Sequence, residues 1–314
     1  MLSLSIDTKF VDAFVTEYAS IVHERLNKTI NSGLSKTNKR NVVKLNPQEK
    51  KVLVKLNTIK TIKHLVTSNS KRLKAIIKYI DNSYPKFHDK NSSVYKVLYN
   101  AFVEHGYNKI DKFKFIQNLK LNTCPYCNRA YIYTINKNRN LKAEIDHFYP
   151  KSLYPYLAIS FYNLIPSCPT CNGLGAKGNR DSYKDNLKNP YEIKDDDFKF
   201  KFDITSLEIV SSKVHTKSIN IYLDKKIKSN DDYFKLESLY QEHRDVVVEL
   251  YQKFYQQDTK EYFESLKKSL QGISISDEDI YRYITCTYQQ QKDFHLRPLS
   301  KFIKDISEEL GIRQ

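Results

Sequence analysis

Apolar side chains recur at helical spacing along the first third of the chain, which predicts a helical region over residues 1–120. The first helix carries its apolar positions at Phe10, Phe14, Tyr18, Ile21 and Val22. Asn46 and Pro47 mark a later helix start, because asparagine caps a helix and proline fits its first position. Ser70 is expected to cap another helix. The helices predicted in this region cover about 7–27, 47–65, 70–80, 93–105 and 111–120.

The hydrophobic pattern changes after the first 120 residues, where alternation with a period of two replaces helical spacing. Residues 129–135 (RAYIYTI) predict a strand, 136–140 (NKNRN) a polar turn, and 141–147 the returning strand of a hairpin. A loop through two prolines follows, and a short helix is expected from Asn172 onward. This part of the chain is therefore predicted as strand, turn, strand, loop and helix.

Beyond Pro190 the pattern alternates at first and turns helical afterwards. Strands are expected over 198–204, 207–212 and 219–223, and helices over 231–256, 258–270, 277–291 and 300–310. The chain is therefore predicted to be an α+β protein with three regions. They are a basic helical region 1–120, a central region 121–190, and a region 191–314 in which short strands precede helices.

Composition places the chain among globular proteins, since 40% of its 314 residues are hydrophobic and 28% are charged. Its net charge of +16 exceeds what solubility requires, which favours a polyanionic partner. Residues 28–78 hold fourteen Lys or Arg and one acid, Glu49, a net charge of +13. Such a segment is typical of nucleic-acid contact, but a lysine-rich solvated helix surface in a chain of biased composition has the same pattern.

No export signal and no membrane span are expected from the sequence. The first residues lack a basic segment before an apolar one, and no run of ~18 apolar residues occurs. A cytoplasmic location is therefore predicted. In a reducing cytoplasm, paired cysteines indicate a metal site before they indicate a disulfide.

Four of the five cysteines form two CxxC pairs, Cys124 with Cys127 and Cys168 with Cys171. Two such turns supply the four thiolates of a tetrahedral zinc site, with Zn–S bonds of about 2.3 Å. Four soft ligands leave no open coordination position, so the predicted zinc is structural. Redox disulfides or unbound thiols are the alternative. Cys286 lies in a stretch predicted to be helical and is expected in the core.

Between the two CxxC pairs lies EIDHFYPKS, residues 144–152, in which Asp146 and His147 are adjacent. Hydrolysis of a phosphodiester needs a base, which neutral imidazole suits, and a hard cation held by oxygen ligands. His147 offers the base, and Asp146 and Asn172 offer the oxygen ligands. Neighbours on a regular strand point to opposite faces, so the pair shares a site only if the strand ends there, as Pro150 favours. This interpretation requires the imidazole to be within reach of solvent.

CPYC, EIDHFYPKS and FYNLIPSCPTCN, with Lys177 beyond them, together resemble the HNH or ββα-metal nuclease family in its zinc-stapled subgroup. The resemblance covers about residues 121–180. It implies a central ββα-metal core, flanked here by helical N- and C-terminal regions. It makes His147 the general base and assigns a catalytic Mg²⁺ or Mn²⁺ to Asp146 and Asn172.

The same resemblance gives roles to further residues. Asn163 would brace the loop and orient the base, and the glycine-rich GLGAKG segment would let Lys177 approach a phosphate. Arg180 is a second candidate for phosphate contact. Glu144 shares a strand face with Asp146 and is a candidate additional metal ligand. Simpler interpretations exist for the whole set: a structural histidine at 147, caps of a turn and a helix at 163 and 172, and surface charges at 177 and 180.

The wider pattern, with its helical extensions, is similar to nucleases of anti-phage defence systems, in particular the Septu-type, PtuB-like HNH subunit. Those nucleases work with a separate ATPase subunit. The residues and this resemblance together predict a metal-dependent DNA endonuclease that leaves a 5′-phosphate, and the resemblance implies a role in anti-phage defence, with DNA and an ATPase subunit as partners. Two alternatives stay open, a non-catalytic zinc-ribbon module that binds nucleic acid and an RNase with the same core. The adjacent Asp146 and His147 favour the enzymes, because a binding module has no need of the pair.

Overall fold

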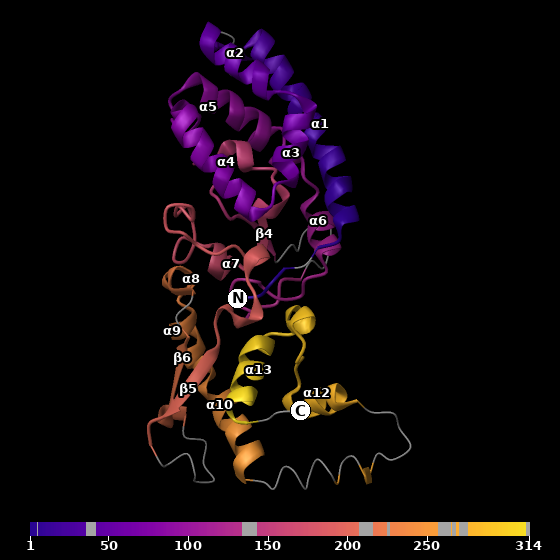
Figure 1. Ribbon diagram of the computed structural model, residues 1–314, viewed down its shortest axis with the longest axis vertical. Helices are drawn as coiled ribbons and strands as arrows, with labels where there is room; N and C mark the ends of the chain where they lie inside the picture. The colour runs from indigo at the N-terminus through magenta and orange to yellow at the C-terminus, as the bar shows by residue number, and fades with distance from the viewer. Residues whose placement is uncertain are drawn as a thin grey trace.

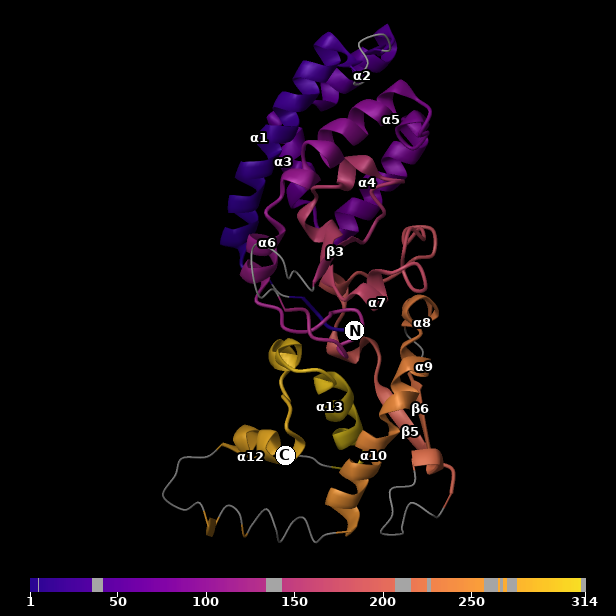
Figure 2. The same cartoon turned by 180° about the vertical axis from the view of Figure 1, so that it is seen from behind.

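A computed structural model describes residues 1–4, 6–35, 42–133, 143–206, 216–224, 227–256, 265, 268–269 and 276–311. The molecule is elongated, with the N-terminal helices at one end and the last helices at the other (Figure 1). The strands β3 and β4 and the helix α7 lie between the two groups of helices, and the view from behind agrees (Figure 2). The fold combines helices with three two-stranded sheets among these residues, which confirms the predicted α+β class.

The N-terminal helices form where the capping signals predict them. Asp7 caps the first helix through Lys9 N, and Asn46 and Glu49 form a capping box at the second. The apolar run expected as one helix is divided in two, because Thr58 caps a new helix. Asn69, and not Ser70, caps the next one. The helices are α1 (Thr8–Ser32), α2 (Pro47–Leu56), α3 (Ile59–Thr67), α4 (Ser70–Ser83), α5 (Ser93–Leu98) with the π-helix η2 (Tyr99–Glu104), and α6 (Lys112–Leu119); β1 (Leu34–Ser35) pairs with β2 (Val42–Val43).

The central strands pair differently from the predicted hairpin. Strand β3 (Glu144–His147) runs antiparallel to β4 (Leu164–Ser167), with His147 opposite Leu164. The predicted strand 129–135 is described only as far as residue 133. Within it, Tyr131 forms an isolated antiparallel bridge with Thr123. The predicted turn 136–140 lies outside the described residues. The order along the chain is therefore strand, long loop, strand and helix.

The short helix after β4 also differs from the prediction. Helix α7 (Pro169–Asn172) ends at Asn172, where the sequence led us to expect a start. Pro169 occupies its first position, which proline fits because that position needs no N–H donor. Consequently both Cys168 and Cys171 lie on this helix or directly before it, and the glycine-rich segment follows it as turns.

The last part of the chain forms a third sheet and a set of short helices. Strand β5 (Phe200–Ile204) pairs with β6 (Ile219–Leu223), as two of the predicted strands require, and the predicted strand 207–212 lies outside the described residues. The predicted helix 231–256 is divided, and Lys235, with a left-handed φ of 49°, separates its first two pieces. The helices are α8 (Lys228–Phe234), α9 (Leu236–Tyr240), α10 (Arg244–Tyr251) with the π-helix η12 (Gln252–Gln256), α12 (Asp277–Thr285) and α13 (Ser300–Glu309).

Three predictions near the C-terminus are wrong or only partly described. The helix expected over 277–291 ends at Thr285, because Cys286 takes a left-handed φ of 54°. Cys286 is exposed there, so its predicted place in the core is wrong. Most of the predicted helix 258–270 lies outside the described residues. Within the described ranges, no helix combines the length and the apolar character needed to cross a membrane.

Short 3-10 helices connect the larger elements. Three of them, η3, η4 and η5, lie in the segments that lead to the central strands or link them. The 3-10 helices are η1 (Pro85–Phe87), η3 (Tyr107–Lys109), η4 (Pro155–Leu157), η5 (Phe161–Asn163), η6 (Pro190–Glu192), η7 (Asp195–Asp197), η9 (Thr216–Ser218), η11 (Gln241–His243) and η13 (Gln291–Leu296).

Aromatic packing joins the N-terminal helices to the central loop. The ring of Phe161, in η5, lies 5.4 Å from Phe14 of α1 and 5.5 Å from Phe115 of α6. Edge-to-face and tilted pairs at such distances add about 0.5–1.5 kcal/mol each beyond their buried area. The loop between β3 and β4 is therefore packed firmly against helices that are distant in sequence.

Asn128 joins the first cysteine turn to the last helix. It has a left-handed φ of 50°, and its amide donates hydrogen bonds to Thr123 Oγ1 (3.0 Å) and Phe294 O (3.1 Å). Its side-chain oxygen accepts a hydrogen bond from the backbone N–H of Lys301, 3.2 Å away. The buried side chain thus anchors the turn that carries Cys127 to the start of α13.

Candidate metal centre and adjoining polar site

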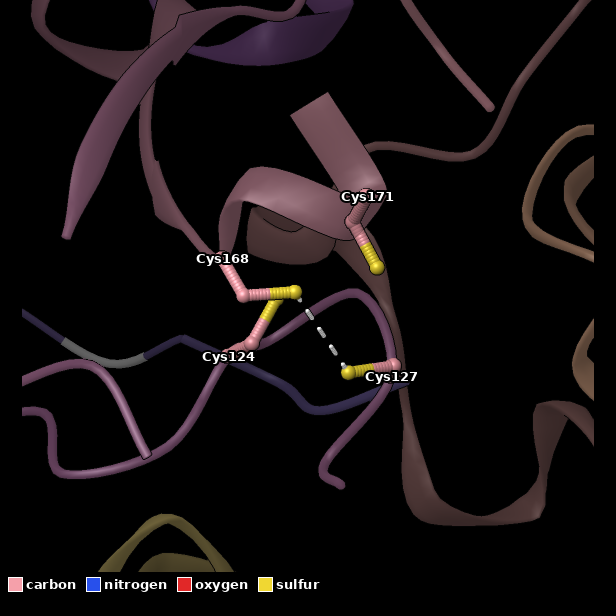
Figure 3. A group of neighbouring side chains, drawn as sticks. All are labelled: Cys124, Cys127, Cys168 and Cys171. Carbon is pink, nitrogen blue, oxygen red and sulfur yellow. Dashed lines mark hydrogen bonds between the residues drawn. The ribbon is translucent and has the colours of Figure 1, made fainter. Parts of the chain in front are cut away.

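The four paired cysteines come together at one point. Cys124 and Cys127 lie at the ends of a turn, Cys168 lies directly before α7 and Cys171 within it, and their sulfurs gather in Figure 3. All four Sγ atoms lie within 4.8 Å of one another, and those of Cys127 and Cys168 are 4.0 Å apart. A tetrahedral site with ~2.3 Å Zn–S bonds places sulfurs roughly 3.8 Å apart, whereas a disulfide needs about 2.05 Å. The buried cluster can therefore hold a zinc ion, as the spacing predicts.

The cysteine turn is held in place by hydrogen bonds to its backbone and to one sulfur. The N–H of Arg129 points at Cys127 Sγ (3.4 Å), and the Tyr240 hydroxyl donates to Cys127 O (2.7 Å). Burial raises the pKa of the Cys124 thiol well above its ordinary value. Because burial penalises isolated thiolates, four of them at this point need a bound cation to compensate their charge.

Asp146 lies beside this cluster and is fully engaged. The Tyr126 hydroxyl donates to its Oδ2 (2.6 Å), and the Lys177 ammonium forms an ion pair with its Oδ1 (3.0 Å). Lys177 also donates to the carbonyl of His147 (2.7 Å). Asp146 is 4% exposed and Lys177 0%. Burial raises the pKa of Tyr126 well above its ordinary value, and Asp146 raises it further, so the hydroxyl stays protonated as a donor.

His147 ends β3, and its imidazole has a defined tautomer. Its Nε2 lies 3.1 Å from Ala158 O, and since a carbonyl only accepts, Nε2 carries the proton. Burial lowers the pKa of His147 well below its ordinary value of 6.5, and the Lys151 ammonium lowers it further, so the ring is neutral. Nδ1 then presents a lone pair and has no hydrogen-bond partner among the described residues. The Tyr107 ring packs edge-on against the imidazole at 4.3 Å.

The imidazole is buried, whereas the sequence interpretation requires it to be within reach of solvent. His147 is 5% exposed, so the arrangement described here is a closed one. The Asp146 carboxylate and the His147 backbone share the Lys177 ammonium, but their two side chains do not hydrogen-bond each other. The strand does end at His147, as expected.

Asn163 lies across the loop that links the two central strands. Its side-chain oxygen accepts a hydrogen bond from the N–H of Tyr149 (2.7 Å), and its amide donates to the carbonyls of Tyr149 (3.1 Å) and Leu157 (3.0 Å). The residue is completely buried. One side chain thus fixes the segment that follows His147 to the segment that carries Ala158, the acceptor for the imidazole.

Replacing Asn163 with alanine is expected to lower the free energy of unfolding by about 3 kcal/mol, because three buried backbone groups lose their partners. Asn118→Ala, at an exposed position of α6, is the matched control and should change stability by less than about 0.5 kcal/mol. Urea denaturation of both variants measures the difference. Equal stabilities would show that Asn163 does not brace the loop.

Asn172 does not face Asp146. Its amide donates to Glu144 Oε2 (2.6 Å), at the exposed end of β3. Asp146 has both oxygens engaged and its charge neutralised by Lys177. These residues, as arranged here, therefore do not fit a divalent cation, and the Mg²⁺ or Mn²⁺ assignment stays a prediction of the resemblance.

The two residues predicted to contact phosphate lie in different surroundings. Lys177 is buried in its ion pair with Asp146, whereas Arg180 is exposed and its guanidinium stacks over the Tyr233 ring, 3.5 Å from the centroid. Phosphate contact stays a prediction for both. The sequence analysis did not identify Tyr126 as a partner of Asp146 or Tyr107 as a partner of His147. Nothing in the local pattern of either tyrosine indicates a contact with a strand twenty or more residues away.

The described geometry is thus a buried Asp–His pair at the end of a strand, held beside a four-cysteine cluster that can bind zinc. A segment of 69 residues is 39% identical to the Septu protein PtuB of Bacillus thuringiensis, a match that covers 22% of this chain and 24% of that protein. The match therefore spans about a quarter of the relative's length, and it supports the Septu-type resemblance. No protein-family model matches the chain, and no solved structure gives a significant match.

Proposed function

We propose that this protein is a nuclease that hydrolyses phosphodiester bonds of DNA, built on a ββα core of the HNH type with a structural zinc ion. The observation that carries the proposal is the state of His147. One nitrogen donates to a backbone carbonyl and the other keeps its lone pair, as a general base requires. Orientation of a base by a third group is a recurrent feature of hydrolytic sites.

The residues of the described site have separate parts in this proposal. His147 accepts a proton from water at Nδ1, and the Ala158 carbonyl keeps the imidazole in the required tautomer. Asn163 holds the loop that carries that carbonyl. The four thiolates hold α7 against the first cysteine turn, which keeps the strands and the intervening loop together.

The closed arrangement around Asp146 is part of the proposal. A nuclease that cuts DNA with little sequence preference endangers the cell that makes it, so a resting state without access to substrate is an advantage. The enclosed imidazole and the occupied carboxylate of Asp146 support such a resting state. Activation then requires the segments around His147 to open.

The partial match to PtuB supports a role in the cell of the kind that the sequence resemblance implies. We assign the protein to anti-phage defence in the cytoplasm, as the effector that damages DNA, with an ATPase subunit as a regulatory partner that raises the activity of the isolated chain.

Purified zinc-loaded protein, incubated with supercoiled plasmid and with a labelled RNA, tests the proposed reaction. We expect nicked and linear plasmid with intact RNA in the presence of Mg²⁺ or Mn²⁺, and no cleavage after EDTA treatment. Cleavage of RNA alone would favour the RNase alternative. Binding of both nucleic acids without cleavage would favour a non-catalytic zinc-ribbon module.

A further inference from the structure

Two lysines from distant segments meet at one aromatic ring beside His147. The ammonium of Lys112 lies 4.9 Å from the centroid of the Tyr107 ring, and that of Lys151 lies 4.6 Å from it. The ring itself is fixed, because its hydroxyl donates to Ile145 O of β3 (3.3 Å) and its edge packs on the imidazole. Both ammonium groups are thus held next to the proposed base.

Neither lysine has an anionic partner within the described part of the chain. No carboxylate oxygen lies within 4.0 Å of the ammonium of Lys112 or Lys151 there. Asp146 acts on Lys151 only from a distance, and its charge is already paired with Lys177. Contact with an aromatic face compensates an ammonium only in part, by about 0.5–2 kcal/mol.

The placement of both lysines is electrostatically unfavourable. Each is half-buried, and burial lowers the pKa of Lys151, with the Lys112 ammonium lowering it further. Lys112 is also the first residue of α6, where the positive end of the helix dipole disfavours a cation. An anion that binds between the two ammonium groups would stabilise both charges. Among the described residues, no carboxylate contacts either ammonium to fill this role.

We propose that Lys112 and Lys151, supported by the Tyr107 ring, form the site that receives a phosphate group of the nucleic-acid backbone next to His147. This inference rests on the proposed function, because it identifies where the substrate's phosphate lies in that site. The two lysines contact non-bridging phosphate oxygens and carry no information on base sequence. They are binding residues and hold the phosphodiester within reach of the imidazole.

Binding of a fluorescein-labelled 20-base-pair DNA duplex to the full-length zinc-loaded protein, without added divalent cation, tests this site by fluorescence anisotropy. Lys112→Ala and Lys151→Ala are each expected to weaken binding about five- to tenfold. Each should also reduce the slope of log K against log salt by about one, as the loss of one phosphate contact requires. Lys112→Arg and Lys151→Arg keep the charge and should bind nearly as well as the parent.

Lys109→Ala is the matched control, since Lys109 is exposed and lies three residues before Lys112. It removes the same charge and should change the affinity by less than twofold. If the two alanine variants bind like Lys109→Ala, with unchanged salt slope and normal thermal unfolding, the phosphate site is wrong, whatever the cleavage assay gives. If they lose binding while the parent cleaves no nucleic acid, the phosphate site stands and the proposed reaction falls.

Discussion

Serine in place of Cys127 is expected to abolish tight zinc binding and to unfold the central part of the chain. The cysteine sulfurs connect the first turn to α7, and loss of one of the four ligands removes this connection. Structural zinc contributes about 10–16 kcal/mol to folding in zinc-finger peptides at pH 7. That contribution is comparable with the usual net stability of a domain, about 5–15 kcal/mol, so its loss is enough to unfold the central part. Metal analysis and thermal unfolding of the purified variant measure both effects.

Cys286→Ser is the control for this substitution, because Cys286 is exposed and lies apart from the cluster. It should bind one zinc ion per chain and unfold at the temperature of the parent. A Cys127→Ser protein that also binds one zinc ion and unfolds with Cys286→Ser would show that the cluster does not hold the fold together.

Methionine in place of Lys177 is expected to lower the free energy of unfolding by about 3–5 kcal/mol. The substitution leaves the Asp146 carboxylate buried with no cation beside it, which is the costly way to break a buried ion pair. Lys184→Met is the control, because the Lys184 side chain is 78% exposed and its ammonium lies 4.0 Å from Asp181. It should change stability by less than about 0.5 kcal/mol.

A double-variant cycle separates the ion pair from the loss of packing. In Asp146→Asn with Lys177→Met no charge remains buried, and the amide still accepts the hydrogen bond from Tyr126. We expect the double variant to recover at least about 1 kcal/mol relative to Lys177→Met alone. Additive losses in urea denaturation would mean that the two side chains do not interact as the structure describes.

The helices of the first 120 residues and the four-cysteine cluster could be predicted from the sequence because their signals are local. Asn46 with Pro47 and Glu49 defines a helix start within four residues, and each CxxC turn defines two ligands within four. Such patterns need no knowledge of the rest of the chain. The α+β class follows from them together with the alternating segments.

The pairing of the central strands was not predictable in the same way. Strand β4 contains Pro166 and follows a 3-10 turn, so it shows no alternation, and a loop of sixteen residues, 148–163, separates it from its partner β3. The sequence analysis instead paired residues 141–147 with the nearer alternating segment, 129–135. Choosing between the two requires the long-range packing of Phe161 against α1 and α6.

The closed arrangement around Asp146 and His147 could not be predicted from the sequence for a related reason. Lysine is rarely buried unless it is paired, and the partner of Lys177 is 31 residues away in sequence. Lys112 and Lys151 come from an N-terminal helix and from the central loop, so no local motif unites them. The residue types of the Asp146–His147 pair indicated hydrolysis, but their partners could be found only in three dimensions.

Cleavage of supercoiled plasmid by His147→Ala, beside the parent and His64→Ala, tests the central claim most directly. His64 is exposed on α3, so its substitution removes an imidazole that takes no part in the proposed reaction. With one zinc ion bound in all three proteins, we predict that His147→Ala cleaves at least about 100-fold more slowly than the parent, while His64→Ala cleaves at the parent's rate. Equal cleavage by His147→Ala and the parent would contradict the assignment of His147 as the base, and with it the proposed nuclease site.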